Sequence, residues 1–197
     1  MTSLEAALRE INTNLTDAHV SFAVVGGLAV SARTEPRFTR DADLAVALAS
    51  DAEAEALIRV LGARRYRIEA IVEQEAVGRL ATVRLTHSSE LRSPVIDLLF
   101  ASSGIEPEVV AEAEPIELLS HLTMGVARTG HLIALKVLSR DDVSRPQDLV
   151  DLRALLRVAS PHELARARES VALIAARGYD RGRDLMAELA ALYPSWS

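Results

Sequence analysis

The sequence predicts an α/β (α+β) protein, in which a mixed twisted sheet is flanked by helices and followed by a helical part. Two observations predict this class. Short apolar runs typical of strands alternate with helical stretches up to about residue 104. After that residue the sequence is mainly helix-forming, with breaks at prolines and glycines. We therefore expect an α/β core over residues 1–104 and a mainly helical C-terminal part over residues 105–197 packed on it.

The first expected elements alternate between helix and strand. A T-x-x-E capping box at Thr2 opens the first helix, and two glycines after the first strand predict a tight turn. A proline-containing loop separates the second helix from the second strand. These elements are a helix over 2–17, a strand over 21–25, a helix over 28–32, a strand over 41–48 and a helix over 51–61.

Further strands are expected before the helical part, over 66–70, 79–86 and 94–100. The segment RLATVRLTH alternates between apolar and polar residues, as a half-exposed antiparallel strand does. The segment PVIDLLF is apolar except for Asp97, which indicates a buried strand that carries one acid.

Composition excludes several classes of protein. The chain has no cysteine, which excludes disulfides, thiolate metal sites and cysteine nucleophiles. No apolar stretch is long enough to cross a membrane and no secretory signal is recognisable, so we expect a cytoplasmic protein. The net charge is −6 and 4% of residues are aromatic, which argues against a uniformly basic or base-stacking nucleic-acid binder. Arginines gather between Arg33 and Arg92, as a local basic face or as a solvated mixed surface.

Lys136 is the single lysine among 22 basic residues. Arginine supplies positive charge everywhere else in this chain. The lone lysine is therefore either a product of compositional drift or a residue whose task needs a compact, mobile ammonium group.

The most informative stretch is residues 24–46, VVGGLAVSARTEPRFTRDADLAV. A strand ends at Gly26 and Gly27 and a helix begins there, so backbone N–H groups and the helix N-terminus can approach a phosphate closely. After a loop, a new strand opens with Asp41 and Asp43 on either side of an alanine. Alternate residues of a strand face the same side, so these carboxylates are expected to project together.

Paired carboxylates repel each other unless a cation lies between them. Mg²⁺ is the natural partner, because it binds one or two carboxylates together with substrate phosphates. Asp97 is a candidate third ligand or proton acceptor, because a buried, unpaired carboxylate would be costly. A chance D-x-D, an ordinary glycine turn and an edge-strand acid would be simpler explanations. The order of the features favours a magnesium site formed by Asp41, Asp43 and Asp97.

This arrangement resembles the active-site signature of the polymerase-β-like nucleotidyltransferase superfamily, in which a Gly-Gly or Gly-Ser turn precedes D-x-D and a third acid. The finer resemblance is to AbiEii-type toxins and their mycobacterial MenT relatives. It rests on RFTRDADL (37–44), HLIALKVLSR around Lys136 and RPQDLVDL (145–152), and covers the chain from Phe22 to about Leu156. The resemblance implies a nucleotidyltransferase-type fold.

The resemblance also implies roles for individual residues near the D-x-D motif. Gly26 and Gly27 would cradle the phosphates of a nucleotide. Arg37 and Thr39 belong to the matching R-x-T-x-D-x-D pattern and would contribute to nucleotide binding.

Two acids of the C-terminal part compete for one implied role. Lys136 would contact the nucleotide phosphates, and Asp148 would hold or orient it as part of the catalytic set. Asp151 lies three residues further along the same helical face and is the alternative. An acid favoured near a helix N-terminus is the simpler explanation of Asp148, and the family resemblance favours the functional role over it.

The implied activity is Mg²⁺-dependent transfer of a nucleotide, from CTP or UTP, to the 3′ end of tRNA, which would block aminoacylation, translation and growth. Two hypotheses compete with it. One is nucleotidylation of a small molecule such as an aminoglycoside, which the acidic net charge suits at least as well. The other is an inactive NTP-binding partner within a toxin–antitoxin pair.

A cognate antitoxin is the expected protein partner. It would act by occlusion or by phosphorylation of Thr39, whose hydroxyl lies two residues before Asp41. Thr39 as a simple capping or lining residue of its loop is the alternative.

Overall fold

The computed structural model describes residues 3–37, 39–87, 94–141 and 146–192. Expectations that involve Thr2, Arg92 and Arg145 therefore lie outside the described residues. The helices are α1 (Ser3–Asp17), α2 (Gly26–Arg33), α3 (Asp51–Ala63), α4 (Glu106–Ala111), α5 (Thr129–Ser139), α6 (Pro146–Val158), α7 (Pro161–Ala176) and α8 (Leu185–Leu192). The strands are β1 (Phe22–Val25), β2 (Ala42–Val46), β3 (Tyr66–Gln74), β4 (Arg79–His87), β5 (Ile96–Leu99), β6 (Glu114–Leu119) and β7 (Leu122–Val126).

The described strands form one seven-stranded sheet in the order β3-β4-β5-β2-β1-β7-β6. β2 pairs with β5 in parallel and with β1 antiparallel, and β1 pairs with β7 in parallel. The sheet is therefore mixed, as the sequence predicted. β2 lies at its centre, where Leu44 and Val46 are fully buried and anchor the strand that carries the second acid of the D-x-D motif.

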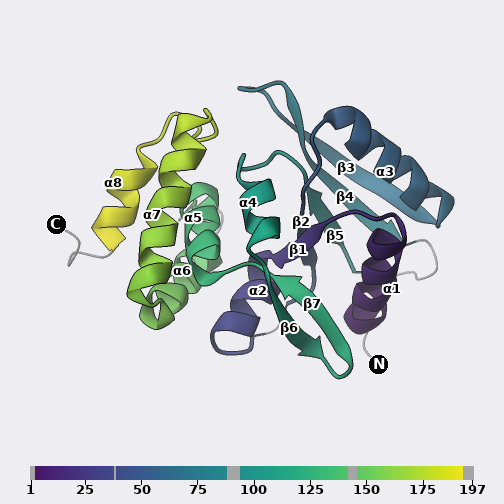
Figure 1. Cartoon of the computed structure of the whole chain (residues 1–197), viewed down its shortest axis with the longest axis horizontal. Coiled ribbons are helices and arrows are strands. Elements are labelled where there is room, and N and C mark those ends of the chain that lie inside the picture. Colours follow the sequence, from purple (N-terminus) through teal and green to yellow (C-terminus); the bar gives the residue numbers. More distant parts are fainter. Residues whose placement is uncertain (1–2, 38, 88–93, 142–145, 193–197) are drawn as a thin grey trace.

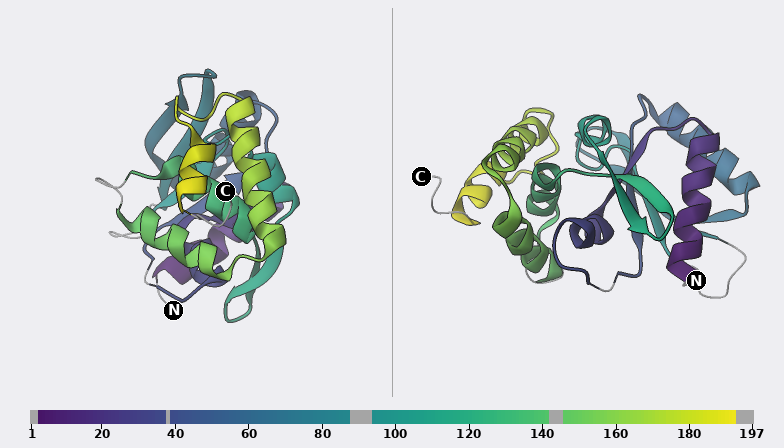
Figure 2. Two further views of the ribbon diagram at one scale, coloured as in Figure 1. Left: turned by 90° about the vertical axis from the view of Figure 1, so that its left-hand side faces the viewer. Right: turned by 60° about the horizontal axis from the view of Figure 1, so that its bottom comes forward.

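Most of the helices gather in two regions around the sheet, and α2 and α4 lie between these regions (Figure 1). α1 and α3 lie near the β3–β4 end, whereas α5, α6, α7 and α8 form a cluster on the opposite side of the molecule, which Figure 2 shows from two further directions. α5 is the inner helix of this cluster, because it packs against α2, α6 and α7 and buries Leu132, Ile133 and Val137. None of the helices in the described ranges is long and apolar enough to span a membrane.

Three details differ from the expected elements. α2 begins at Gly26 itself, two residues earlier than expected, and β2 begins at Ala42, so that Asp41 lies immediately before the strand. β6 and β7 form an antiparallel hairpin within the part expected to be mainly helical, and β7 joins the central sheet through β1. The sheet therefore extends beyond residue 104, and the division into two parts at this residue stays a prediction.

Candidate active site

Gly26 forms the bend between β1 and α2 and has a φ of +61°. A Cβ atom at this position would lie 1.8 Å from Oδ2 of Asp43, so the absent side chain is what allows the carboxylate to reach the bend. At Gly27, a Cβ would lie 2.7 Å from Nη2 of Arg37. The residue before α2 is Val25, which provides no side-chain cap for the helix. The first N–H groups of α2 are thus suited to an anionic ligand.

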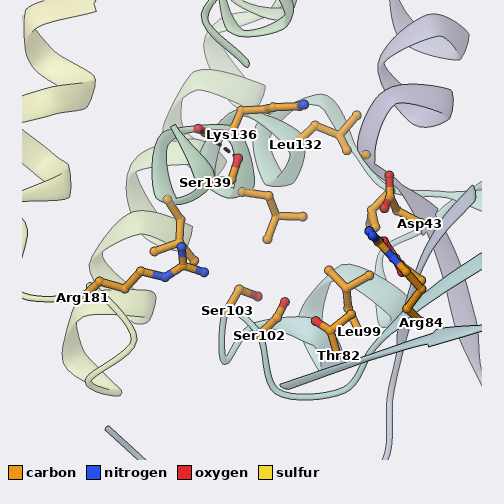
Figure 3. Close-up of a pocket in the computed structure, with 15 residues that line it drawn as sticks. Asp43, Thr82, Arg84, Leu99, Ser102, Ser103, Leu132, Lys136, Ser139 and Arg181 are labelled. Atoms are coloured by element: carbon orange, nitrogen blue, oxygen red, sulfur yellow. Dashed lines mark hydrogen bonds and ion pairs between the residues drawn. The ribbon is translucent and has the colours of Figure 1, made fainter. Parts of the chain in front are cut away.

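Two of the candidate acids, Asp43 and Asp97, lie in one row with Arg84 across the centre of the sheet. Asp43 on β2 is the register partner of Asp97 on β5, and Asp97 is the partner of Arg84 on β4. Side chains of register partners face the same side of a sheet. All three line a cavity of about 320 Å³, whose other walls come from α5 and the loop after β5 (Figure 3).

Asp41 lies at the mouth of a second cavity. It is exposed and lines a space of about 360 Å³ together with Asp43, Gly27, Thr39 and residues of α6. Asp43 and Lys136 line both cavities, so the two spaces meet between β2 and α5. The structure therefore brings Asp41, Asp43 and Asp97 to the same region as the glycine bend.

Asp97 is buried but not unpaired, which corrects the expectation from the sequence. Its Oδ1 accepts a hydrogen bond from Nε of Arg84 at 2.9 Å, and its Oδ2 accepts one from Nη2 at 2.7 Å. The hydrogen bonds and charge of Asp97, with smaller contributions from Asp41 and Asp43, raise the pKa of the Arg84 guanidinium above its ordinary value. All three acids therefore interact electrostatically with Arg84.

The acids fit a divalent ion, although the described residues contain no group of three or more His, Cys, Asp or Glu side chains arranged to hold a metal. Both oxygens of Asp97 are occupied by Arg84 in this structure. Asp41 and Asp43 nevertheless supply the carboxylate oxygens that Mg²⁺ prefers, and Mg²⁺ commonly takes its remaining ligands from substrate phosphates and water. The metal roles of Asp41, Asp43 and Asp97 stay predictions.

Lys136 is held by both candidate acids of α6. Its Nζ lies 2.6 Å from Oδ1 of Asp148 and 2.8 Å from Oδ2 of Asp151. Ser139 donates a further hydrogen bond to Oδ2 of Asp148 at 3.1 Å. The two acids therefore share the task of fixing the ammonium group beside the cavities, and the structure does not single out one of them.

Asp151 also ties α6 to the loop before β2. Burial by itself would raise the pKa of Asp151, but hydrogen bonds from Lys136, Gln147 and Arg37 keep it below its ordinary value. The Arg37 bond to Oδ2 of Asp151 measures 2.8 Å and joins residues 114 positions apart. Arg37 is thus fixed in the second cavity, where it contributes positive charge near Gly27.

Thr39 lines the second cavity, but its hydroxyl is turned inward. The Oγ1 atom is buried and has no hydrogen-bond partner among the described residues. A kinase would have to draw this segment out to reach the hydroxyl. Phosphorylation of Thr39 stays a prediction, and this burial favours its alternative as a lining residue of the loop.

The arginine-rich segment does not form an unpaired basic face across the described residues. Its members lie on α2, the loop before β2, α3 and the turn after it, β3 and β4, and most of them pair with acids within the protein, Arg59 with Glu55 among them. The other pairs are Arg33–Glu114, Arg37–Asp151, Arg64–Asp17, Arg67–Glu69, Arg79–Asp51 and Arg84–Asp97. Much of the arginine enrichment is therefore explained by internal ion pairs.

Several solved structures share this fold. A crystal structure of an antigenic nucleotidyltransferase-like protein from Paracoccidioides brasiliensis has a TM-score of 0.56 and 16% identity, over 97% of this chain and 96% of that one. The lincosamide antibiotic adenylyltransferase LnuA, bound to lincomycin, has a TM-score of 0.51 and 13% identity, over 79% of this chain and 98% of that one. The MenT4 toxin of Mycobacterium tuberculosis H37Rv has a TM-score of 0.32 and 15% identity, over 87% of this chain and 84% of that one. This TM-score is too low to support an inference. No curated protein sequence gives a significant match.

The fold is thus that of the nucleotidyltransferases. The profile of the family described as "Nucleotidyl transferase AbiEii toxin, Type IV TA system" matches residues 8–194. The chain belongs to this family, as the sequence predicted.

We expect Gly26→Ala to weaken NTP binding at least about tenfold, because the added methyl group would displace the Asp43 carboxylate. Gly78→Ala is a matched control, since Gly78 has the same φ of +61° and a Cβ added there would meet no described atom within 4 Å. Both variants should carry backbone strain of about 1–2 kcal/mol, measurable by urea unfolding. Equal NTP affinities in the two variants, measured by calorimetry, would contradict the steric role of Gly26.

Proposed function

We propose that this chain transfers a nucleotide from CTP or UTP to the 3′ end of tRNA in a Mg²⁺-dependent reaction. The observation that carries the proposal is the junction of two cavities at Asp43 and Lys136, next to the uncapped N-terminus of α2. A triphosphate at this junction would meet backbone N–H groups from one side and an ammonium group from the other.

Each part of the site has a chemical role in this proposal. Asp41 and Asp43 would hold Mg²⁺, which would supply a Lewis acid for phosphate oxygens. The N–H groups that follow Gly26 would orient the phosphates, and Lys136 would offset charge on the departing pyrophosphate. The acceptor hydroxyl attacks the α-phosphorus, the bond to the bridging oxygen of the β-phosphate breaks, and pyrophosphate leaves. Asp97 is proposed as a third metal ligand or as the acceptor of the hydroxyl proton.

The tRNA acceptor is supported by family membership and by the resemblance to MenT toxins, rather than by a basic surface. Modification of the acceptor end would stop aminoacylation and translation. Because translation takes place in the cytoplasm, we propose that the protein acts there. The name of the family also implies a cognate antitoxin. An inactive NTP-binding role is disfavoured, because the acids, glycines and lysine of the site are all in place.

A small-molecule acceptor is the second candidate. The net charge of −6 favours a cationic acceptor over a polyanionic one. The structural neighbour LnuA is described as an antibiotic adenylyltransferase, although at 13% identity the likeness concerns the fold.

Incubation with each α-labelled NTP tests the proposal directly, with total tRNA in one arm and aminoglycosides in the other. We expect label from CTP or UTP at the tRNA 3′ end, dependent on Mg²⁺ and lost in Asp41→Ala. Label on an aminoglycoside alone would favour the second candidate. No transfer to either acceptor would contradict the proposed activity, and the absence of Mg-NTP binding would contradict the site itself.

A further inference from the structure

We propose that Arg84 is a built-in cation that occupies Asp97 in the metal-free protein and must release it before Asp97 can join a divalent ion. This inference rests on the proposed function, because it requires a divalent ion at Asp41 and Asp43. Arg84 would then be a positioning residue, which sets how readily the third carboxylate enters the metal site.

The geometry of the pair carries the first step of the argument. Nε and Nη2 of Arg84 each donate to a different oxygen of Asp97, at 2.9 and 2.7 Å. This two-pronged arrangement matches a planar guanidinium to a planar carboxylate and is among the stronger charge-assisted pairings in proteins. A carboxylate held in this way has no oxygen left without a cationic partner.

The burial of the two partners carries the second step. The side chain of Asp97 is 12% exposed, whereas that of Arg84 is 49% exposed. Asp97 is fixed in the row beside Asp43, while Arg84 can extend into the open cavity at little desolvation cost. Release of the pair would therefore proceed by movement of Arg84.

The negative charges of the three neighbouring acids explain why a cationic side chain such as Arg84 is useful here. Asp43 and Asp97 are register partners on adjacent parallel strands, and Asp41 precedes Asp43 by two residues. Without a cation these acids would repel each other. Arg84 supplies positive charge at this point, which offsets part of the repulsion before a metal binds.

Mn²⁺ binding measured by calorimetry tests the inference on Arg84→Gln, Arg84→Lys and the unchanged protein. We expect both variants to bind Mn²⁺ about tenfold more tightly, because neither can hold both oxygens of Asp97 as arginine does. Arg84→Lys keeps the positive charge, so it separates the loss of the pairing from a general change in electrostatics. Arg79→Lys is the matched control on the same strand, since Arg79 pairs with Asp51 away from the site, and it should leave Mn²⁺ affinity unchanged.

A second readout remains informative if a variant is unstable. Thermal unfolding in EDTA should show Arg84→Gln below the unchanged protein, and Mn²⁺ should raise its midpoint by more than it raises that of the unchanged protein. Adding Asp97→Asn to Arg84→Gln should remove this extra gain. Unchanged or weaker Mn²⁺ affinity in both Arg84 variants would overturn the inference. Failure of every protein, including the unchanged one, to bind Mn²⁺ with or without NTP would instead overturn the proposed function as well.

Discussion

Asp43→Asn should lower nucleotide transfer by on the order of a thousandfold or more, the largest effect that we expect from a single change. Asp43 lines both cavities, lies against the Gly26 bend and neighbours Asp97, so no other described acid can take over its place. The fold should survive, because replacing one of several clustered carboxylates by an amide relieves repulsion. Initial rates with labelled NTP and thermal unfolding would measure the two effects.

The control for this change is Glu55→Gln, which neutralises an exposed acid on α3. It alters the net charge of the protein by the same amount and should keep the transfer rate within about twofold, because isolated surface substitutions have small effects. Transfer by Asp43→Asn within about threefold of the unchanged protein would remove this residue from the catalytic set.

Lys136→Met should reduce the free energy of unfolding by about 3–5 kcal/mol, the largest stability effect that we expect. The side chains of Asp148 and Asp151 are 4% and 1% exposed, and both depend on the ammonium group of Lys136. Its removal leaves two largely buried carboxylates without the cation that they share. Asp151 keeps its hydrogen bonds from Arg37 and Gln147, and Asp148 keeps the one from the hydroxyl of Ser139 among its contacts. Urea unfolding provides the measurement.

The double variant Lys136→Met/Asp148→Asn tests the cause of this loss. It should recover part of the stability, because it neutralises one of the two buried carboxylates that pair with the ammonium group. A double variant no more stable than Lys136→Met would show that packing of the lysine stem, rather than charge, accounts for the loss. A single variant that loses less than about 1 kcal/mol would contradict the buried-pair explanation altogether.

The local pattern of the sequence was sufficient to predict the centre of the fold. A glycine turn after one strand and two acids at the start of the next are patterns of neighbouring residues. Such patterns can be recognised from the sequence alone. The mixed sheet agrees with the sequence prediction, and Asp43 lies against Gly26 through the register of β1 with β2. The single lysine lies at the junction of both cavities, and its role in nucleotide binding stays a prediction.

Residues that meet through strand register or helix packing were not predictable in this way. Arg84 appeared as one polar position in an alternating strand, and its pairing with Asp97 depends on how β4 aligns with β5. Arg37 and Asp151 meet across 114 positions. The β6–β7 hairpin was not predicted, because Pro115 indicates a break between helices as readily as the start of a strand. Its signal was the alternation in LTMGV, which is too short to decide between helix and strand.

Hydrogen–deuterium exchange with Mg²⁺ and a non-hydrolysable NTP analogue tests most directly whether these distant segments form one nucleotide site. We predict slower exchange in four segments together, residues 24–30, 39–46, 132–141 and 146–152, and no change in the edge strand β3. Protection that is absent from the first two segments, or that appears mainly around β3 and α3, would contradict a nucleotide site at the glycine bend.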